Sequence, residues 1–437
     1  MTNSMKRLTS SLLFAAAALL LVACSGNPNG VVKNNCVSDC GDDPGRELFG
    51  PADESDWVSF RNGPRRTGVA QGGVLGTDVR EMWRQEDFLV LDYSAAKPSG
   101  AVWGDTLYYP SDGGAMWAFD RHTGDRLWRT ELTDASNGIH SSPAVTRATV
   151  LIGTYSGWLH ALDRQSGDEI WRYRVGNVIG SSPVYVWEHN AIYTSHETPQ
   201  EGELPGGGYV TRNDPNSGEP DWRSDKLGHW PHASVAVDPE RNIVVVGAND
   251  GIFHAYSTDT GEELWSRDYE PGEEYDPGTA DIKTTAAISA EHGLAVFGTW
   301  DRHMYALDLE TGDEVWKVDT GGSVMGSAAL HDESGRVYLG TRAGEGLIAV
   351  DIDTGEVAWR ADVGAGITSS PAVNSAGDGL VVGTNGGEVV GVDTSDGSVV
   401  WRFEAGGAVT ASPAWVGRHI YVAAKKGDLF ALETIDE

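Results

Sequence analysis

Short runs of β-forming residues, each four to six residues long, alternate with polar and glycine-containing turns along most of the chain. One stretch shows the pattern clearly: Ser141–Val145, Val150–Thr154, Trp158–Asp163 and Glu169–Arg172 follow one another with only a few residues between them. Runs of this length, bounded by Gly, Asn, Asp and Ser, are typical of antiparallel strands. We therefore predict four strands here, named A to D in chain order, that form one antiparallel sheet.

The same pattern recurs along the chain, and this repetition is the strongest signal in the sequence. Strand D of each unit carries a tryptophan, and successive tryptophans lie 42 to 51 residues apart. A turn of the form D-x-x-T-G stands at Asp120–Gly124, Asp308–Gly312 and Asp351–Gly355. A single sheet cannot bury both of its faces, so we expect the units to stack as blades with a tryptophan wedged between neighbours. The eight positions are Trp83, Trp128, Trp171, Trp222, Trp265, Trp316, Trp359 and Trp401.

The last unit is incomplete, and a segment near the first tryptophan supplies what it lacks. Ser412–Ala414, Tyr421–Ala424 and Leu429–Glu433 match strands A, B and C, and no tryptophan follows them. The segment Val79–Arg84, which contains Trp83, can serve as the missing strand D. Pairing these two ends closes a ring and removes the exposed sheet edge. The predicted fold is all-β, an eight-bladed β-propeller of four-stranded antiparallel blades over residues 79–437, closed by pairing of its N- and C-terminal strands.

Composition excludes some classes of function and leaves the predicted fold unchanged. The 437 residues include 64 acidic and 32 basic side chains, a formal net charge of −32, so the chain lacks the basic surface that nucleic-acid binding requires. An acidic excess of this size fits a salt-rich environment, where screening relieves self-repulsion. The length alone would suggest two or three domains, but the repeat assigns most of it to one, and we expect a monomeric propeller.

The N-terminus has the features of a bacterial export signal. Lys6 and Arg7 precede Leu8–Ala23, an apolar stretch of 16 residues that is short for a membrane-spanning helix. The stretch ends in Leu-Val-Ala-Cys, which resembles a lipobox in which Cys24 carries the acyl chains. The motif implies a signal peptide over residues 1–23 and a lipid-anchored outer-membrane protein, facing the periplasm or the cell surface. The alternative is an ordinary secretory signal that is cut after a small residue.

Two further segments separate the signal from the propeller. Residues 24–56 contain few apolar side chains and many Gly, Asn, Asp and Pro residues, so we expect a flexible tether. Cys36 and Cys40 lie in this tether, where they either form a local disulfide or stay free thiols. Zinc needs about four ligands, and no second cysteine pair lies nearby. Residues 57–78 form a leader segment between the tether and the propeller.

The repeat units resemble the pyrroloquinoline quinone (PQQ) type of β-propeller repeat, with its SSPAV strand and its turn before a tryptophan. The resemblance covers about residues 57–437 and includes a leader motif at Trp57–Asn62 and Arg66–Gly68. A lipoprotein signal followed by such a propeller resembles the BamB-type outer-membrane assembly lipoproteins. This second resemblance implies a non-enzymatic scaffold that binds envelope proteins, among them the barrel-assembly complex.

The enzymes that carry this repeat are quinoprotein dehydrogenases, and the sequence departs from their pattern. Those enzymes place a vicinal Cys-Cys disulfide over the cofactor, whereas residues 41–437 contain no cysteine. No set of Glu, Asn and Asp residues matches their calcium and quinone motifs position by position. We therefore expect no catalytic residue, no metal and no cofactor, neither PQQ nor Ca²⁺. One alternative is a PQQ-dependent periplasmic quinoprotein dehydrogenase, and another is a surface propeller that binds a ligand such as a polysaccharide.

Alternating strand directions sort the loops onto two faces of the ring. Loops D–A and B–C share one face, and the insertions Glu197–Gly208 and Tyr269–Lys283 both fall on it. We predict that partners or ligands bind on this face, because the other face consists of short regular turns. Four histidines on one rim could also hold a metal, although loop histidines are more often simply solvated. The candidate residues of the rim are His140, His196, His229, Trp230, His232, Trp300 and Asp301.

Overall fold

The computed structural model describes residues 32–33, 56–89, 98–132, 135, 138–198, 206–269, 281–342, 346–425 and 427–436. The predicted signal peptide, Cys24 and the pair Cys36 and Cys40 lie outside these residues. Within them the regular secondary structure is entirely β-strand. A search of the same residues finds no helix that is long and apolar enough to cross a membrane.

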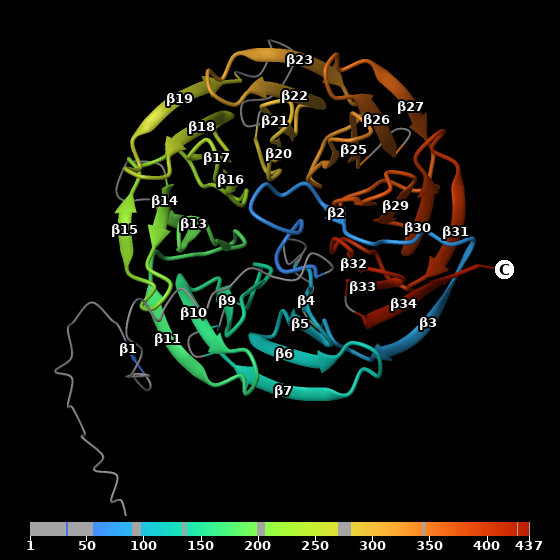
Figure 1. The fold of residues 1–437 in the computed structure, drawn as a ribbon, viewed down its shortest axis with the longest axis horizontal. Coiled ribbons are helices and arrows are strands. Elements are labelled where there is room, and N and C mark those ends of the chain that lie inside the picture. Colours follow the sequence, from blue (N-terminus) through green and yellow to red (C-terminus); the bar gives the residue numbers. More distant parts are fainter. Residues whose placement is uncertain are drawn as a thin grey trace, which may run out of the picture.

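Eight four-stranded antiparallel blades surround a central axis, which confirms the predicted fold class (Figure 1). In each blade the strands run from the axis outward in the order A, B, C, D. Blades 1 to 4 consist of β4 (Ala101–Trp103), β5 (Thr106–Pro110), β6 (Ala115–Asp120) and β7 (Arg126–Glu131); β8 (Ala144–Val145), β9 (Thr149–Gly153), β10 (Trp158–Asp163) and β11 (Glu169–Arg174); β12 (Val184–Val186), β13 (Ala191–Thr198), β14 (Gly207–Asn213) and β15 (Pro220–Arg223); and β16 (Ala236–Asp238), β17 (Ile243–Gly247), β18 (Ile252–Ser257) and β19 (Glu263–Asp268).

The next three blades repeat this arrangement around the ring. They consist of β20 (Ala287–Ser289), β21 (Leu294–Gly298), β22 (His303–Asp308) and β23 (Glu314–Asp319); β24 (Ala329–His331), β25 (Arg336–Gly340), β26 (Leu347–Asp351) and β27 (Val357–Ala361); and β28 (Ala372–Asn374), β29 (Gly379–Gly383), β30 (Glu388–Asp393) and β31 (Val399–Glu404). Two short strands join these blades from outside the repeat: β1 (Val32–Lys33) pairs with the outer strand β11, and β2 (Val69–Ala70) pairs in parallel with the inner strand β28.

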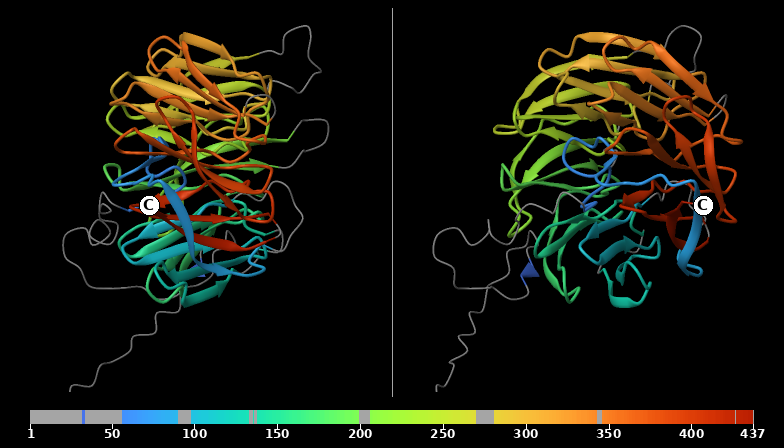
Figure 2. Two further views of the ribbon diagram at one scale, coloured as in Figure 1. Left: turned by 90° about the vertical axis from the view of Figure 1, so that its right-hand side faces the viewer. Right: turned by 45° about the vertical axis from the view of Figure 1, so that its right-hand side comes forward.

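Blade 8 combines the two ends of the repeat region, as predicted. Its inner strands are β32 (Ala414–Val416), β33 (His419–Ala423) and β34 (Leu429–Ile435), and its outer strand is β3 (Asp78–Gln85). The pairing runs antiparallel from Asp78 opposite Ile435 to Gln85 opposite Leu429. Side views show β3 on the outer wall of the ring beside the C-terminal strand (Figure 2). The ring is therefore closed by main-chain hydrogen bonds between segments more than 340 residues apart.

The blades are held together mainly by apolar contacts between them. Every residue of β9 and of β17 is buried, although each strand lies inside its blade. Outer strands such as β19 instead bury their tryptophan and expose most of the remaining side chains. The buried faces of neighbouring blades form clusters that span two blades, as expected of a repeat protein whose single units have no core of their own.

The strand-D tryptophans join each blade to the next one. Trp316 is 6 % exposed, and its indole Nε1 donates a 2.7 Å hydrogen bond to the carbonyl of Ile352 in the following blade. Gly355, in the D-x-x-T-G turn of that blade, has φ +69°, and a Cβ there would lie 2.8 Å from the indole of Trp316. The other seven tryptophans donate the equivalent bond, with leader residue Leu75 accepting from Trp401. The recurring Trp and Gly are thus two halves of one inter-blade contact.

The leader crosses the central channel and contacts most of the blades from inside (blue in Figure 1). Trp57 pairs with Val102 in blade 1 through two main-chain hydrogen bonds. Further along, leader carbonyls accept hydrogen bonds from the inner strands of five more blades. The pairs are Val58 with Val145, Pro64 with Val237, Arg65 with Ile288, Thr67 with Leu330, and Gly68 with Val373. The leader is therefore an internal part of the propeller.

Candidate functional site

The D–A and B–C loops lie together on one face of the ring, which we call the loop face. In several blades a residue of the B–C loop donates a main-chain hydrogen bond to the D–A loop that enters the same blade. Asn249 donates to Trp230 at 3.1 Å, and Trp300 donates to Asp281 at 3.0 Å. These bonds fix the loops to one another, so side chains from neighbouring loops have defined positions around the axis.

A funnel of about 370 Å³ opens on the loop face at the axis of the ring. Its wall combines side chains from the inner strands with side chains from the loops, and Phe60 of the leader lines it from deeper in the channel. The lining residues are Phe60, His140, Ser142, Tyr155, Gly180, Ser182, Trp230, His232, Ser234, Lys283, Thr285, Met325, Ser327, Thr368, Ser370, Thr410 and Ser412. We call this cavity the central funnel.

A ring of hydroxyl groups surrounds the axis, with one residue from each blade at the start of its inner strand, and all of these residues except Ser99 line the funnel. Seven of the eight hydroxyl oxygens accept a hydrogen bond from the main-chain N–H of the equivalent residue in the preceding blade. The chain of bonds runs from Ser99 through Ser142, Ser182, Ser234, Thr285, Ser327 and Ser370 to Ser412, at distances of 2.8 to 3.0 Å. Ser99 Oγ, at the open end of this chain, has no hydrogen-bond partner among the described residues.

Two arginines of the leader lie beneath this hydroxyl ring and are completely buried. Arg66 donates hydrogen bonds to the carbonyls of Ser182, Pro183, Val235 and Phe60, and Arg61 donates to the carbonyls of Ala328 and Pro371. Several of these carbonyls belong to funnel serines or to the residues directly after them. No carboxylate pairs with either guanidinium within the part of the chain that the structure describes.

Burial lowers the pKa of both buried arginines, to about 9 in each case. For Arg61 the neighbouring positive charge of Arg66 adds to the effect of burial. A pKa of about 9 still leaves both side chains charged at neutral pH. Two positive charges therefore lie buried beneath the residues that line the funnel, in a protein whose formal net charge is −32.

Three of the seven predicted rim residues line the funnel: His140, Trp230 and His232. The ring of His140 lies against Tyr155, with ring centroids 3.9 Å apart. Burial, assisted by the nearby His232, lowers the pKa of His140 to about 4, so this imidazole is neutral at physiological pH. His232 Nδ1 lies 2.9 Å from Glu197 Oε1, a carboxylate that sequence reasoning did not single out.

The other four predicted residues do not line the funnel. His196 is buried in β13 with no partner for either ring nitrogen among the described residues, and burial lowers its pKa to about 4. His229 packs against Trp230 outside the funnel, with ring centroids 5.2 Å apart. Trp300 lies beside two cations, Lys283 and Arg342, each 4.8 Å from its ring centroid. Asp301 pairs with His303 at 3.2 Å.

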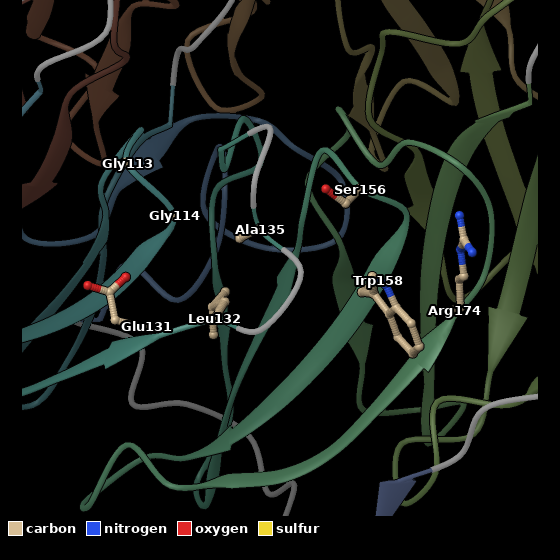
Figure 3. Close-up of a pocket in the computed structure, with 8 residues that line it drawn as sticks. All are labelled: Gly113, Gly114, Glu131, Leu132, Ala135, Ser156, Trp158 and Arg174. Carbon is tan, nitrogen blue, oxygen red and sulfur yellow. The ribbon is translucent and has the colours of Figure 1, made fainter.

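A second cavity of about 650 Å³ lies between blades 1 and 2 on the loop face, and we call it the outer cleft. Figure 3 shows Glu131 on one side and Arg174 on the other, with the indole of Trp158 near the arginine. The guanidinium of Arg172 lies 5.2 Å from the Trp158 ring centroid and holds that ring in position. The remaining lining residues are Gly113, Gly114, Leu132, Ala135 and Ser156.

Most of the side chains that line the two cavities could not be identified from loop composition. The sequence predicts the serines of the SSP motifs as strand material. The motif itself stands in only three blades, but a Ser or Thr occupies the position of its second serine in all eight, on the innermost strand near the axis. Phe60, Arg61 and Arg66 belong to a recognised leader motif, but the motif gave no indication that the segment enters the channel. Trp158 and Arg174 carry no sequence signal beyond the repeat itself.

Comparison with known proteins adds the family context. A family model described as outer membrane protein assembly factor BamB matches residues 80–196, 206–366 and 343–436. A quinohemoprotein alcohol dehydrogenase of Comamonas testosteroni is 33 % identical over 124 residues, and quinohemoprotein alcohol dehydrogenase ADH IIB of Pseudomonas putida is 23 % identical over 254 residues. These alignments cover 25 % and 50 % of this chain, but only 16 % and 34 % of the two relatives.

Solved structures show the same fold in both groups of proteins. The crystal structure of the Comamonas testosteroni quinohemoprotein alcohol dehydrogenase matches with a TM-score of 0.70 at 16 % identity, over 88 % of this chain and 81 % of that one. The structure of BamB from Moraxella catarrhalis matches with a TM-score of 0.63 at 18 % identity, over 81 % of this chain and 99 % of that one. At these identities the likeness concerns the fold alone.

The prediction of no cofactor, neither PQQ nor Ca²⁺, is wrong in view of these relatives. Both curated relatives are quinohemoproteins by name, so sequences similar to this repeat occur in proteins that are named for a quinone and a haem. The relatives also include enzymes as well as a BamB protein.

The donors of the central funnel can be compared with what such a cofactor needs. Its lining provides hydroxyls, imidazoles and one ammonium group, which suit the acidic substituents of a quinone. Calcium takes six to eight oxygen ligands, commonly from carboxylates and carbonyls, and the lining includes no carboxylate. A search of the described residues also finds no group of three or more His, Cys, Asp or Glu side chains that could hold a metal ion. The funnel therefore fits the organic anion but not the calcium ion, and we derive no catalytic step from either.

Proposed function

Because the chain belongs to the outer membrane protein assembly factor BamB family, we propose that it is a non-enzymatic scaffold that binds proteins of the cell envelope. The observation that carries this proposal is the extent of the family match, which reaches from residue 80 to residue 436 and so includes strands of all eight blades. An assembly role in the outer membrane would follow that of the family. Its partners would include the barrel-assembly complex.

The proposal includes a lipid anchor at the N-terminus. The apolar stretch Leu8–Ala23 followed by Cys24 supports acylation of that cysteine and attachment to the outer membrane. The tether of residues 24–56 would then allow the propeller to reach a membrane-embedded partner. Mass spectrometry of the purified N-terminal peptide would test this part: an acylated Cys24 supports the anchor, and an unmodified cysteine contradicts it.

The loop face is the surface on which we propose that partners bind. The outer cleft places a half-buried tryptophan, Trp158, beside two arginines, and tryptophan and arginine are among the residues enriched at the energetic centres of protein interfaces. Glu131 on the opposite wall gives the cleft charge of both signs, which can orient a bound segment.

Affinity capture from solubilised membranes of the native host tests the proposal. We expect the tagged full-length chain to recover the barrel-assembly complex, and the double variant Trp158→Ala, Arg174→Glu to recover about tenfold less. The double variant Leu264→Ala, Arg267→Glu is a matched control on the outer strand β19 and should behave like the unmodified chain. Recovery of no envelope protein by the unmodified chain would contradict the scaffold function.

A second function is favoured by one specific observation, the similarity to the quinohemoprotein alcohol dehydrogenases. On this hypothesis the chain would be an oxidoreductase that holds a quinone in the central funnel. Incubation with PQQ and Ca²⁺, followed by a dye-reduction assay with alcohols, distinguishes the two functions. A quinone absorbance band that survives gel filtration, together with dye reduction, would support the oxidoreductase and contradict a purely non-enzymatic scaffold.

A further inference from the structure

We propose that the central funnel is a binding site for a carboxylate group, built from the hydroxyl ring, Lys283 and the two buried arginines of the leader. The site is independent of the outer cleft and of the envelope partner. It concerns the chemical class of ligand that the axis of the ring can hold. The carboxylate could belong to a small organic acid or to the C-terminus of a polypeptide.

The charge distribution around the axis carries the first part of the inference. Arg61 and Arg66 are fully buried and bonded only to carbonyl oxygens, so each keeps a full positive charge without a carboxylate partner among the described residues. The two charges have the same sign and repel one another, and the low dielectric at the centre of the ring strengthens this repulsion. An anion in the funnel, directly above them, would relieve this repulsion. The surrounding protein is strongly acidic, so the axis is an exception to its overall charge.

The hydroxyl ring supplies the hydrogen-bond donors. In each Ser-Ser or Thr-Thr pair the first hydroxyl is used within its own blade, as when Ser369 donates to the carbonyl of Gly383 at 2.8 Å. The second hydroxyl, such as that of Ser370, accepts from the preceding blade and donates to no acceptor in the described part of the chain. Its hydrogen is therefore available to a ligand, and charge-assisted bonds to a carboxylate are stronger than bonds to a neutral acceptor.

Lys283 adds a cation at the wall of the funnel. Its Nζ lies 2.7 Å from Asp281 and 4.8 Å from the ring centroid of Trp300, which together hold the ammonium group in place. The carboxylates that contact lining residues are thus already engaged, Asp281 by Lys283 and Glu197 by His232. The two guanidinium charges beneath them have no such counterion.

The size and the walls of the funnel limit the ligand further. A volume of about 370 Å³ is at the lower end of the range for small-molecule sites. Aromatic side chains, among them Tyr155 and Trp230, also line the funnel and provide apolar surface to a ligand. These dimensions suit a small polycarboxylate or the last few residues of an extended chain.

Calorimetric titration of the purified full-length chain tests the site with defined probes. One arm uses citrate, and the other compares acetyl-tetraalanine that has a free C-terminal carboxylate with the same peptide as its C-terminal amide. Binding of citrate supports a small-acid source, and binding of the peptide acid but not of the amide supports a chain-end source. Because no envelope partner is present, this result is separate from the capture experiment.

Variants of the lining decide whether the funnel is the place of binding. Lys283→Met should weaken binding about tenfold, whereas Lys283→Arg should largely retain it. Lys317→Met is the matched control, since Lys317 lies 5.1 Å from an aromatic ring centroid on the outer strand β23. The double variant Ser327→Ala, Ser370→Ala keeps the charges and should also bind more weakly. The proposal is overturned if neither probe binds, if the peptide acid and its amide bind equally well while citrate does not bind, or if Lys283→Met and Lys317→Met bind equally.

Discussion

Two histidines near the loop face are held neutral at physiological pH because the fold buries them. Burial lowers the pKa of both His140 and His196 to about 4. His196 is the more extreme, since neither of its ring nitrogens has a partner among the described residues. Such a group costs stability when it is protonated, because a charged imidazole would then lie in an apolar surrounding without a counterion.

Replacing His196 by phenylalanine should make the protein less sensitive to acid. The pKa of this histidine is about 4 in the folded chain and near 6.5 when unfolded, so between these values the unfolded chain binds more protons. Its contribution therefore lowers the free energy of unfolding as the pH falls from 6.5 to 4. At pH 5 we expect His196→Phe to be more stable than the unmodified chain by roughly 2 kcal/mol.

Urea unfolding at pH 5 and pH 8 measures this difference. The comparison at pH 8 is the internal control. The imidazole of His196 is neutral there in both the folded and the unfolded chain, so only the difference in packing remains. A stability difference that is the same at the two pH values would show that His196 does not titrate as its burial indicates.

The same residues show what sequence reasoning can and cannot place. Strand alternation assigned His140, His196 and His232 to one region of the molecule. It could not tell that His196 is buried in the sheet while His140 and His232 face a cavity, because depth depends on packing between blades. The serine ring was missed for a related reason. A residue that looks like ordinary strand material in one blade becomes part of a cavity wall only when the copies from neighbouring blades meet at an axis.

Among the elements, the leader is the one whose role was least evident from its sequence. It has no hydrophobic periodicity, and its residues make their contacts with blades far away in the chain. Arg66 alone bonds to carbonyls of blades 3 and 4 and of the leader itself. The blades, by contrast, were predictable in number, order and closure, since each repeats a local pattern of strands and turns.

Replacing Arg66 by methionine should therefore destabilise the whole ring. Several buried carbonyls would lose a charged donor, and hydrogen bonds of this kind contribute about 1.5 to 3 kcal/mol each, so we expect a loss of at least about 3 kcal/mol. Urea unfolding followed by tryptophan fluorescence measures the change. Arg80→Met is the control: Arg80 is 64 % exposed and pairs with Glu433 on the surface, so its loss should cost less than about 1 kcal/mol. Equal effects of the two variants would contradict a structural role for the buried leader.

For the whole molecule, ring closure and net charge act in opposite directions. Main-chain pairing of β3 with β34 and the eight tryptophan contacts hold the ring together, whereas 64 acidic against 32 basic side chains repel one another across it. The acidic side chains are frequent in the regular turns between strands C and D. There Asp120 and its equivalents accept main-chain N–H bonds, which accounts for the lowered pKa of Asp120. Each such aspartate therefore stabilises its own turn, but it also adds a negative charge to the repulsion across the ring.

Added salt should therefore raise the thermal stability of this protein. Screening shortens the range of charge repulsion from about 10 Å at 0.1 M salt to about 3 Å at 1 M, so the repulsion across the ring should largely disappear. We expect the midpoint of thermal unfolding to rise by several degrees between about 0.05 M and 1 M NaCl. Sucrose at matched osmolality is the control, because it favours the compact state by exclusion without screening charges. A midpoint that falls with NaCl, or that rises no more than in sucrose, would show that the acidic surface does not limit stability, since an intramolecular repulsion of this origin cannot persist once the charges are screened.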